Sequence, residues 1–124
     1  LTGAVGVALG REVCGVMGNQ QPLVDQLLAA GERAGELGWQ LPMWEQFDDA
    51  IKSDLADIKN YSGREAGTIT AAAFLKAFVN DVPWVHLDIA GVAWTDADKG
   101  YRPKGPTGTP VRTVIELLRG WQDA

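Results

Sequence analysis

Two short stretches of the sequence hold the side chains best suited to acid–base or metal chemistry. The first, SDLADIK at 53–59, contains two carboxylates and an amine, from Asp54, Asp57 and Lys59. Paired carboxylates can hold a divalent metal ion or divide the acid and base roles of a reaction. A metal site needs further ligands at matched geometry, and nothing nearby in the sequence supplies them. We therefore favour a solvated face or structural ion pairs here.

The second stretch pairs the single histidine, His86, with Asp88. Residues two apart on a strand share a face, so Asp88 could orient His86 as a general base. Such a base would still need a nucleophile or a substrate contact. Because both residues lie within an apolar run, we expect a hydrogen-bonded structural pair instead.

The remaining reactive or ligand-binding patterns are weaker. Cys14, between Val13 and Gly15, is expected to be a small buried apolar residue and not a reactive thiol. The early glycines lack the GxGxxG spacing, and no Lys-Ser/Thr pair follows them as in a phosphate loop. The KGPTG stretch at 104–108 precedes a predicted helix whose amino end could favour an anion, but loop closure is the simpler interpretation.

Alternating strands and helices must position these residues. The pattern predicts a buried strand over 12–17 and an amphipathic helix from Pro22 to near Leu37. It also predicts a helix from 43 to about 52, although Ser53-Asp54 could begin an extended segment, and a buried helix over 70–79.

The second half of the chain contains the clearest strand signal. Residues 84–92 are apolar on both faces, which predicts a central strand covered by helices. A long ordered loop over 96–109 follows, and Thr109 could cap a last helix with Pro110 in its first turn. The expected inner face of that helix comprises Val111, Val114, Ile115 and Leu118.

Length and charge exclude several classes of protein. With 124 residues the chain is one domain at most, and its net charge of −5 argues against nucleic-acid binding. One cysteine cannot form an intrachain disulfide, and one histidine excludes sites that need two imidazoles. The apolar opening at 1–10 is too short and glycine-rich to span a bilayer and has no basic leader. We expect a segment to precede Leu1, the alternative being a cloned or processed chain that starts there.

Whole segments of the sequence resemble the carboxy-terminal part of the leucyl aminopeptidase family, the cytosol-type two-metal aminopeptidases. LTGA at 1–4 and HLDIAG at 86–91 are the most specific matches. The others, in the family's order and spacing, are QLLAAGERAGELGWQLPMW at 26–44, KSDLADIKNYSGREAGTITAAAFLKAFV at 52–79 and YRPKGPTGTPVRTVIELL at 101–118.

The resemblance implies hydrolysis of the amino-terminal residue of peptides by an enzyme with two divalent metal ions (zinc, manganese or magnesium). Such metals polarise the scissile carbonyl and activate water. The family's metal ligands and catalytic residues lie upstream of LTGA, and its Asn-Thr-Asp-Ala-Glu-Gly-Arg signature is absent from this sequence. The resemblance therefore assigns no catalytic residue and no metal ligand to this chain. It implies a cytoplasmic homohexamer for the whole protein, with a peptide substrate and no nucleic-acid or membrane partner.

By the same resemblance, part of the substrate cleft lies in this chain. The backbone of Leu1 and Gly3 matches the segment near the bound peptide, and Ala90 and Ala93 match positions that line the pocket for the amino-terminal side chain. Small residues there would admit a bulky aliphatic group. Some family members carry a larger Met at the Ala93 position, which would alter the width of the pocket.

We therefore expect an α/β fold: a partial mixed sheet covered by helices, forming the carboxy-terminal portion of a larger three-layer catalytic domain, with residues 1–124 as one incomplete domain. On its own, such a portion should expose an apolar sheet edge and tend to associate. The alternative is a stand-alone, non-catalytic module used for binding or assembly. A third possibility is that the rest of the enzyme is a separate chain, cleaved before LTGA.

Overall fold

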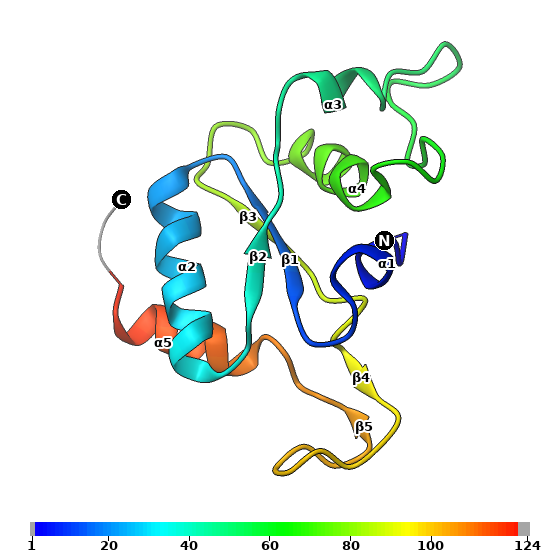
Figure 1. Cartoon of the computed structure of the whole chain (residues 1–124). Helices are drawn as coiled ribbons and strands as arrows, with labels where there is room; N and C mark the ends of the chain where they lie inside the picture. Colours follow the sequence, from blue (N-terminus) through cyan, green and yellow to red (C-terminus); the bar gives the residue numbers. More distant parts are fainter. Residues whose placement is uncertain (1, 122–124) are drawn as a thin grey trace.

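The computed structural model describes residues 2–121, which form an α/β fold (Figure 1). The elements, in chain order, are α1 (Val5–Leu9), β1 (Cys14–Gly18), α2 (Gln21–Ala34), β2 (Gly38–Gln40), α3 (Gln46–Asp49), α4 (Gly67–Lys76), β3 (Val85–Asp88), β4 (Trp94–Thr95), β5 (Gly105–Pro106) and α5 (Val111–Arg119). Leu1 lies outside the described residues.

The sheet is mixed, as the sequence predicts. Its strand order is β2-β1-β3, with β1 parallel to β2 and antiparallel to β3. Successive residues of β1 point to opposite faces: a Cβ at Gly18 would meet Val24 of α2, whereas one at Gly15 would meet Val5 of α1 and Thr68 near the start of α4. Helices α2 and α5 therefore cover one face, and α1 and α4 cover the other.

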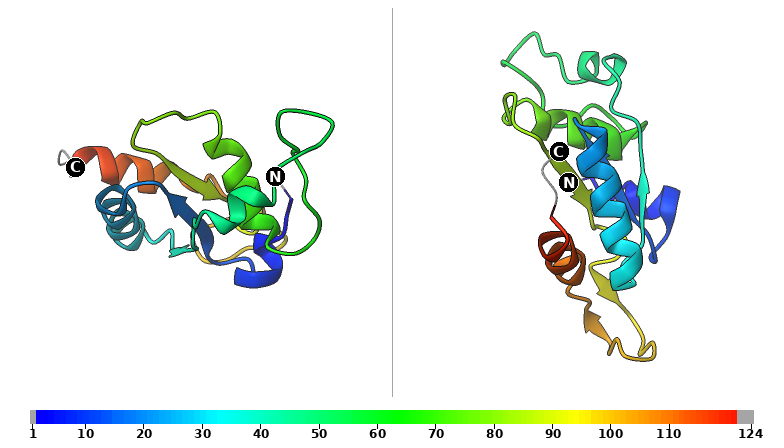
Figure 2. Two further views of the ribbon diagram at one scale, coloured as in Figure 1. Left: turned by 90° about the horizontal axis from the view of Figure 1, so that it is seen from above. Right: turned by 90° about the vertical axis from the view of Figure 1, so that its left-hand side faces the viewer.

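The main apolar core lies between the sheet and α2. Cys14 and Val16 of β1 pack there against Val24 and Leu27 of α2, and Leu87 of β3 joins them. Figure 2 shows α5 beside α2 in both views. Helix α2 begins with Pro22 in its first turn and ends where Gly35 adopts φ 67°, a left-handed conformation that glycine adopts readily.

The structure corrects the expectation of a central strand over 84–92. The strand spans only Val85–Asp88 and forms an edge of the sheet, because β1 occupies the centre. It ends at Asp88, whose side chain accepts a hydrogen bond from the backbone N–H of Ala90 and turns the chain out of the sheet. The apolar residues after Asp88 belong to that turn.

Two helix predictions were also wrong in part. The segment 43–52 forms only the short helix α3. In α5, the predicted inner residues Val111, Val114, Ile115 and Leu118 are exposed, and the buried residue is Thr113. Within residues 2–121, no side chain caps α5, at whose start Pro110 occupies the N-cap position. The bonds from Thr113 to Glu36 set the rotation of α5 about its axis.

The predicted loop over 96–109 contains one short strand, β5, which pairs with β4 just before the loop. The short strands β4 and β5 pair antiparallel, Trp94 with Pro106 and Thr95 with Gly105. The resulting hairpin extends away from the main sheet (Figure 1).

Candidate functional site

The segment that follows β3 holds Ala90 and Ala93 in a hydrogen-bonded turn. The N–H of Ala90 donates to Oδ1 of Asp88 at 3.1 Å. The N–H groups of Val92 and Ala93 both donate to the carbonyl of Ile89 at 2.9 Å. Ala90 is exposed and Ala93 is half-buried. The backbone of the turn is therefore fixed while its alanine side chains are available to a neighbour.

Thr107, just beyond β5, holds the far side of this turn. Its N–H donates to the carbonyl of Ala93 at 3.0 Å, and its hydroxyl donates to the carbonyl of Val92 at 2.7 Å. The β4–β5 hairpin thus returns the chain to the turn and closes it.

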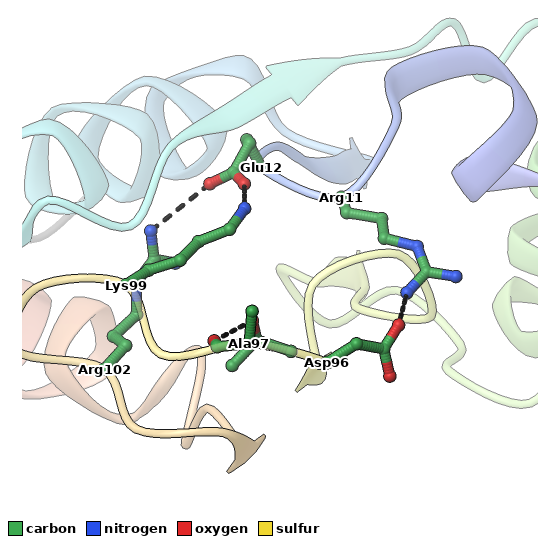
Figure 3. Close-up of polar contacts among 7 residues, drawn as sticks. Arg11, Glu12, Asp96, Ala97, Lys99 and Arg102 are labelled. Atoms are coloured by element: carbon green, nitrogen blue, oxygen red, sulfur yellow. Dashed lines mark hydrogen bonds and ion pairs between the residues drawn. The ribbon is translucent and has the colours of Figure 1, made fainter.

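An ion-pair network in turn ties the hairpin to the segment between α1 and β1 (Figure 3). Lys99 and Arg102 both contact Glu12, the latter at 3.2 Å, and Arg11 pairs with Asp96. The hydrogen bond from Lys99 is the main cause that lowers the pKa of Glu12. These charges are largely exposed, so we assign them an orienting role with little stabilisation.

Helix α1 lies directly against the turn. A Cβ built on Gly91 would lie 2.3 Å from the carbonyl oxygen of Gly10 and 3.5 Å from the Cα of Gly6. Only glycine permits such a close backbone approach. Gly3 lies two residues before α1, and its carbonyl accepts the N–H of Gly6. The segment that contains Gly3 and the turn that contains Ala90 and Ala93 therefore both adjoin α1.

A hollow of about 480 Å³ opens beside Gly3. Its walls come from the segment 2–8, from Leu41, and from the segment between Tyr61 and Ile69. Gly3 adopts φ 73° there and its Cβ position is open space. Ala90 and Ala93 do not line this hollow, so the described residues bring only Gly3 to it.

Asp88 and His86 share a face of β3, but no hydrogen bond between them is present in the described residues. Asp88 is 2% exposed, and within residues 2–121 its Oδ2 has no hydrogen-bond partner, nor has Nε2 of His86. The ring of His86 stacks on Trp84 with centroids 6.2 Å apart. Burial lowers the pKa of His86, and the charge of Asp88 opposes that shift. The expected hydrogen-bonded pair was therefore wrong, although both side chains do share one face.

The other residues with possible chemistry lie elsewhere. Asp54, Asp57 and Lys59 are exposed, which confirms the solvated face. Cys14 is buried and burial raises the pKa of its thiol to about 11, as expected for an inert thiol. Among residues 2–121, no three His, Cys, Asp or Glu side chains gather as a metal site would require, so these residues do not fit the two-metal centre that the family implies.

Sequence reasoning missed a buried carboxylate, Glu36. It lies on the face of the sheet that α2 and α5 cover, opposite to the face of Asp88. Its Oε2 accepts hydrogen bonds from the N–H of Thr113 at 2.8 Å and from the Thr113 hydroxyl at 2.7 Å. Its Oε1 accepts a hydrogen bond from the Nε–H of Arg112 at 3.1 Å. Burial raises the pKa of Glu36, but the bonds from Thr113 and Arg112 outweigh it, and the net shift is downward. Only the position of Glu36 directly after the Gly35 that ends α2 could have drawn attention to it.

Comparison with known proteins identifies the family. The family described as "Cytosol aminopeptidase family, catalytic domain" matches residues 1–115. The chain is 54% identical over 125 residues to a probable cytosol aminopeptidase of Roseiflexus castenholzii, covering 100% of this chain and 26% of that protein. It is 55% identical to one of Geobacter sp. (strain M21), covering 96% and 24%, and 53% identical to one of Desulforapulum autotrophicum, covering 98% and 24%.

These matches show the class of protein: the chain is an α/β segment of a peptidase catalytic domain. The chain belongs to the cytosol aminopeptidase family. It spans about a quarter of the length of the curated relatives that it matches. In the part of the chain that the structure describes, no helix has the length and apolar character needed to cross a lipid bilayer.

Proposed function

We propose that this chain forms one wall of the substrate cleft of an aminopeptidase that removes amino-terminal residues from peptides, and that the catalytic residues and metal ligands lie in the rest of the protein. In this proposal Leu1 and Gly3 contact the peptide through their backbone, and Ala90 and Ala93 line the pocket for its amino-terminal side chain. Residues 1–124 are then one incomplete domain.

The observation that carries this proposal is the hydrogen-bonded turn that contains Ala90 and Ala93, in which Gly91 packs against Gly10 at the end of α1. Hydrogen bonds from Asp88 and Thr107 and the close approach of Gly91 to Gly10 fix that turn. A pocket that discriminates among side chains must keep its wall in place, since a single methylene in a hydrophobic pocket is worth only about 1–3 kcal/mol. Small, rigidly held residues suit that task.

Two divalent metal ions (zinc, manganese or magnesium) in the whole protein would polarise the scissile carbonyl and activate water. We assign no step of the hydrolysis to residues of this chain. We also propose that the whole protein is a cytoplasmic homohexamer. Size-exclusion chromatography with light scattering of the full-length protein measures this directly, and a monomer would contradict it.

The test of the function compares two polypeptides. The full-length protein and this chain alone are each assayed with leucine amide and added Mn²⁺. We expect turnover by the full-length protein and none by the chain. Robust turnover by the chain would overturn the claim that the catalytic residues lie outside it, and an inactive full-length protein would overturn the proposed activity.

A substitution in the full-length protein tests the pocket. Ala93→Met should narrow the pocket and lower kcat/KM for leucine amide by about tenfold while affecting alanine amide less, because overpacking penalises the larger side chain. Ala97→Met, in the exposed segment of the hairpin, is the matched control. Equal losses for both substrates, or the same effect from Ala97→Met, would remove Ala93 from the pocket.

A further inference from the structure

The carboxylate of Asp88 accepts a hydrogen bond from the turn that carries the two pocket alanines. It is 2% exposed and its Oδ1 accepts the N–H of Ala90 at 3.1 Å, the side-chain-to-backbone bond of an Asx turn. Burying a carboxylate is costly unless its hydrogen bonds compensate. Asp88 is nevertheless placed here, at the last residue of β3, where the chain must leave the sheet.

The Asp88 bond holds Ala90 directly and is connected to Ala93 through the backbone of the turn. It fixes the start of the turn at Ala90, and the bonds from Val92 and Ala93 to Ile89 continue from that point. The packing of Gly91 on Gly10 leaves no room for the turn to shift toward α1. Without the carboxylate, the N–H of Ala90 would lose its acceptor and Ala90 would be free to rotate away.

We propose that Asp88 is a positioning residue that controls the size selectivity of the pocket for the substrate's amino-terminal side chain, acting through Ala90 and Ala93. This inference rests on the proposed function, because it takes these alanines as the pocket wall. Asp88 touches neither the substrate nor the reacting atoms in this proposal.

The experiment uses the full-length protein with Mn²⁺ and measures kcat/KM for leucine amide and for alanine amide. Asp88→Ala removes the acceptor, and we expect the leucine-to-alanine ratio to fall by about tenfold, the effect of one hydrogen bond to a charged group. Asp88→Asn keeps an oxygen at the same position and should retain the ratio within about twofold. Asp88→Ser, a weaker acceptor for the same N–H, should fall between them.

A matched control separates positioning from general destabilisation. Thr113→Val removes a buried hydroxyl that bonds Glu36 on the opposite face of the sheet. It should lower stability without changing the leucine-to-alanine ratio. If Asp88→Ala does not accumulate in folded form, the comparison of Asp88→Ser with Asp88→Asn makes the same test.

A second readout reports the bond itself. Hydrogen exchange at the amide of Ala90 should be faster in Asp88→Ala and Asp88→Ser than in the wild type, and unchanged in Asp88→Asn. The proposal is overturned if Asp88→Ala lowers kcat/KM equally for both substrates, if Asp88→Asn loses selectivity as fully as Asp88→Ala, or if exchange at Ala90 does not change. Failure of the proposed function would be distinct, because the wild-type full-length protein would then be inactive before any variant is compared.

Discussion

Two carboxylates are buried on opposite faces of the sheet, and their surroundings differ. Glu36, on the face covered by α2 and α5, is 6% exposed, and both of its oxygens accept hydrogen bonds, from Thr113 and Arg112. Asp88, on the face covered by α1 and α4, is 2% exposed, and in residues 2–121 only one of its oxygens has a partner.

The difference separates two regions. Around Glu36 the buried carboxylate oxygens are hydrogen-bonded, whereas around Asp88 and His86 some buried polar atoms have no hydrogen-bond partner in residues 2–121. Buried polar groups in native proteins are almost always hydrogen-bonded, and the exceptions call for an explanation. The unpartnered atoms of Asp88 and His86 lie on the same face as α1 and the segment that bears Gly3. In the described residues, the face covered by α1 and α4 is therefore the one whose buried polar groups are only partly satisfied.

The largest predicted effect tests the region around Glu36, where both carboxylate oxygens are hydrogen-bonded. Glu36→Ala leaves the N–H and hydroxyl of Thr113 without their acceptor and should lower the free energy of unfolding of this chain by about 3 kcal/mol. Urea denaturation followed by tryptophan fluorescence measures it. Glu32→Ala, exposed on α2 four residues before Glu36, should change stability by less than about 0.5 kcal/mol. A similar small loss for Glu36→Ala would mean that this network does not hold α5 to α2.

The next effect tests the contact between α1 and the turn. Gly91→Ala would place its Cβ against the carbonyl of Gly10, and we expect a loss of about 2 kcal/mol in this chain from the forced backbone shift. Gly6→Ala, on the other side of the same contact, meets its nearest atom at 3.9 Å and should be neutral or slightly stabilising. Equal effects in thermal melts of the two variants would contradict the asymmetry of the contact.

The two regions should also respond at different pH. Burial lowers the pKa of His86, so the folded state holds the imidazole neutral while the unfolded chain binds a proton near pH 6.5. Stability is therefore full above about pH 6.5 and decreases as the pH falls toward the folded-state pKa. The lowered pKa of Glu36 gives a second decrease, which begins below about pH 4.3 and proceeds as the pH falls through its folded-state value.

Urea midpoints measured from pH 8 to pH 3 should resolve these two phases. His86→Gln should remove the first phase and leave the second. A profile unchanged by His86→Gln would assign the upper phase to another group.

The smallest predicted effect concerns the region around Asp88, where only one carboxylate oxygen has a partner in residues 2–121. Asp88→Asn keeps an oxygen that can accept the N–H of Ala90. It removes a buried negative charge of which only one oxygen is hydrogen-bonded, and it introduces an amide NH₂ group without a partner. We expect the free energy of unfolding of this chain to change by less than about 0.5 kcal/mol. A loss comparable to that of Glu36→Ala in urea denaturation would show that Asp88 is as fully partnered as Glu36 and would break the comparison.

Local patterns predicted the elements that depend on nearby residues. Pro22 predicts the start of α2 correctly, and the apolar residues Val24 and Leu27 of that helix do face the core, but the helix ends at Ala34 and not near Leu37 as predicted. The same approach was wrong for α5, because its most apolar stripe faces outward. The rotation of α5 depends on the bond from Thr113 to Glu36, which is 77 residues away in the sequence and which periodicity cannot detect.

For the candidate site, resemblance to a family supplied what composition and spacing did not. HLDIAG and LTGA led to Gly3, Ala90 and Ala93, and no pattern of acids or histidines would have led there. The support of those residues was not predictable from spacing, because Thr107, Gly10 and Asp88 meet at the turn from three separate parts of the chain.

The sequence alone determined the α/β class, the family and the identity of the residues proposed for the pocket, because these follow from local propensity and from strings of residues that need no third dimension. Only the tertiary structure decided that β1 is the central strand and that α5 turns its apolar stripe outward. It also decided that, among the residues that the structure describes, Glu36 is fully partnered while Asp88 is not. Those outcomes depend on long-range hydrogen bonds and backbone contacts. Such contacts form only when distant segments pack together, so no local pattern encodes them.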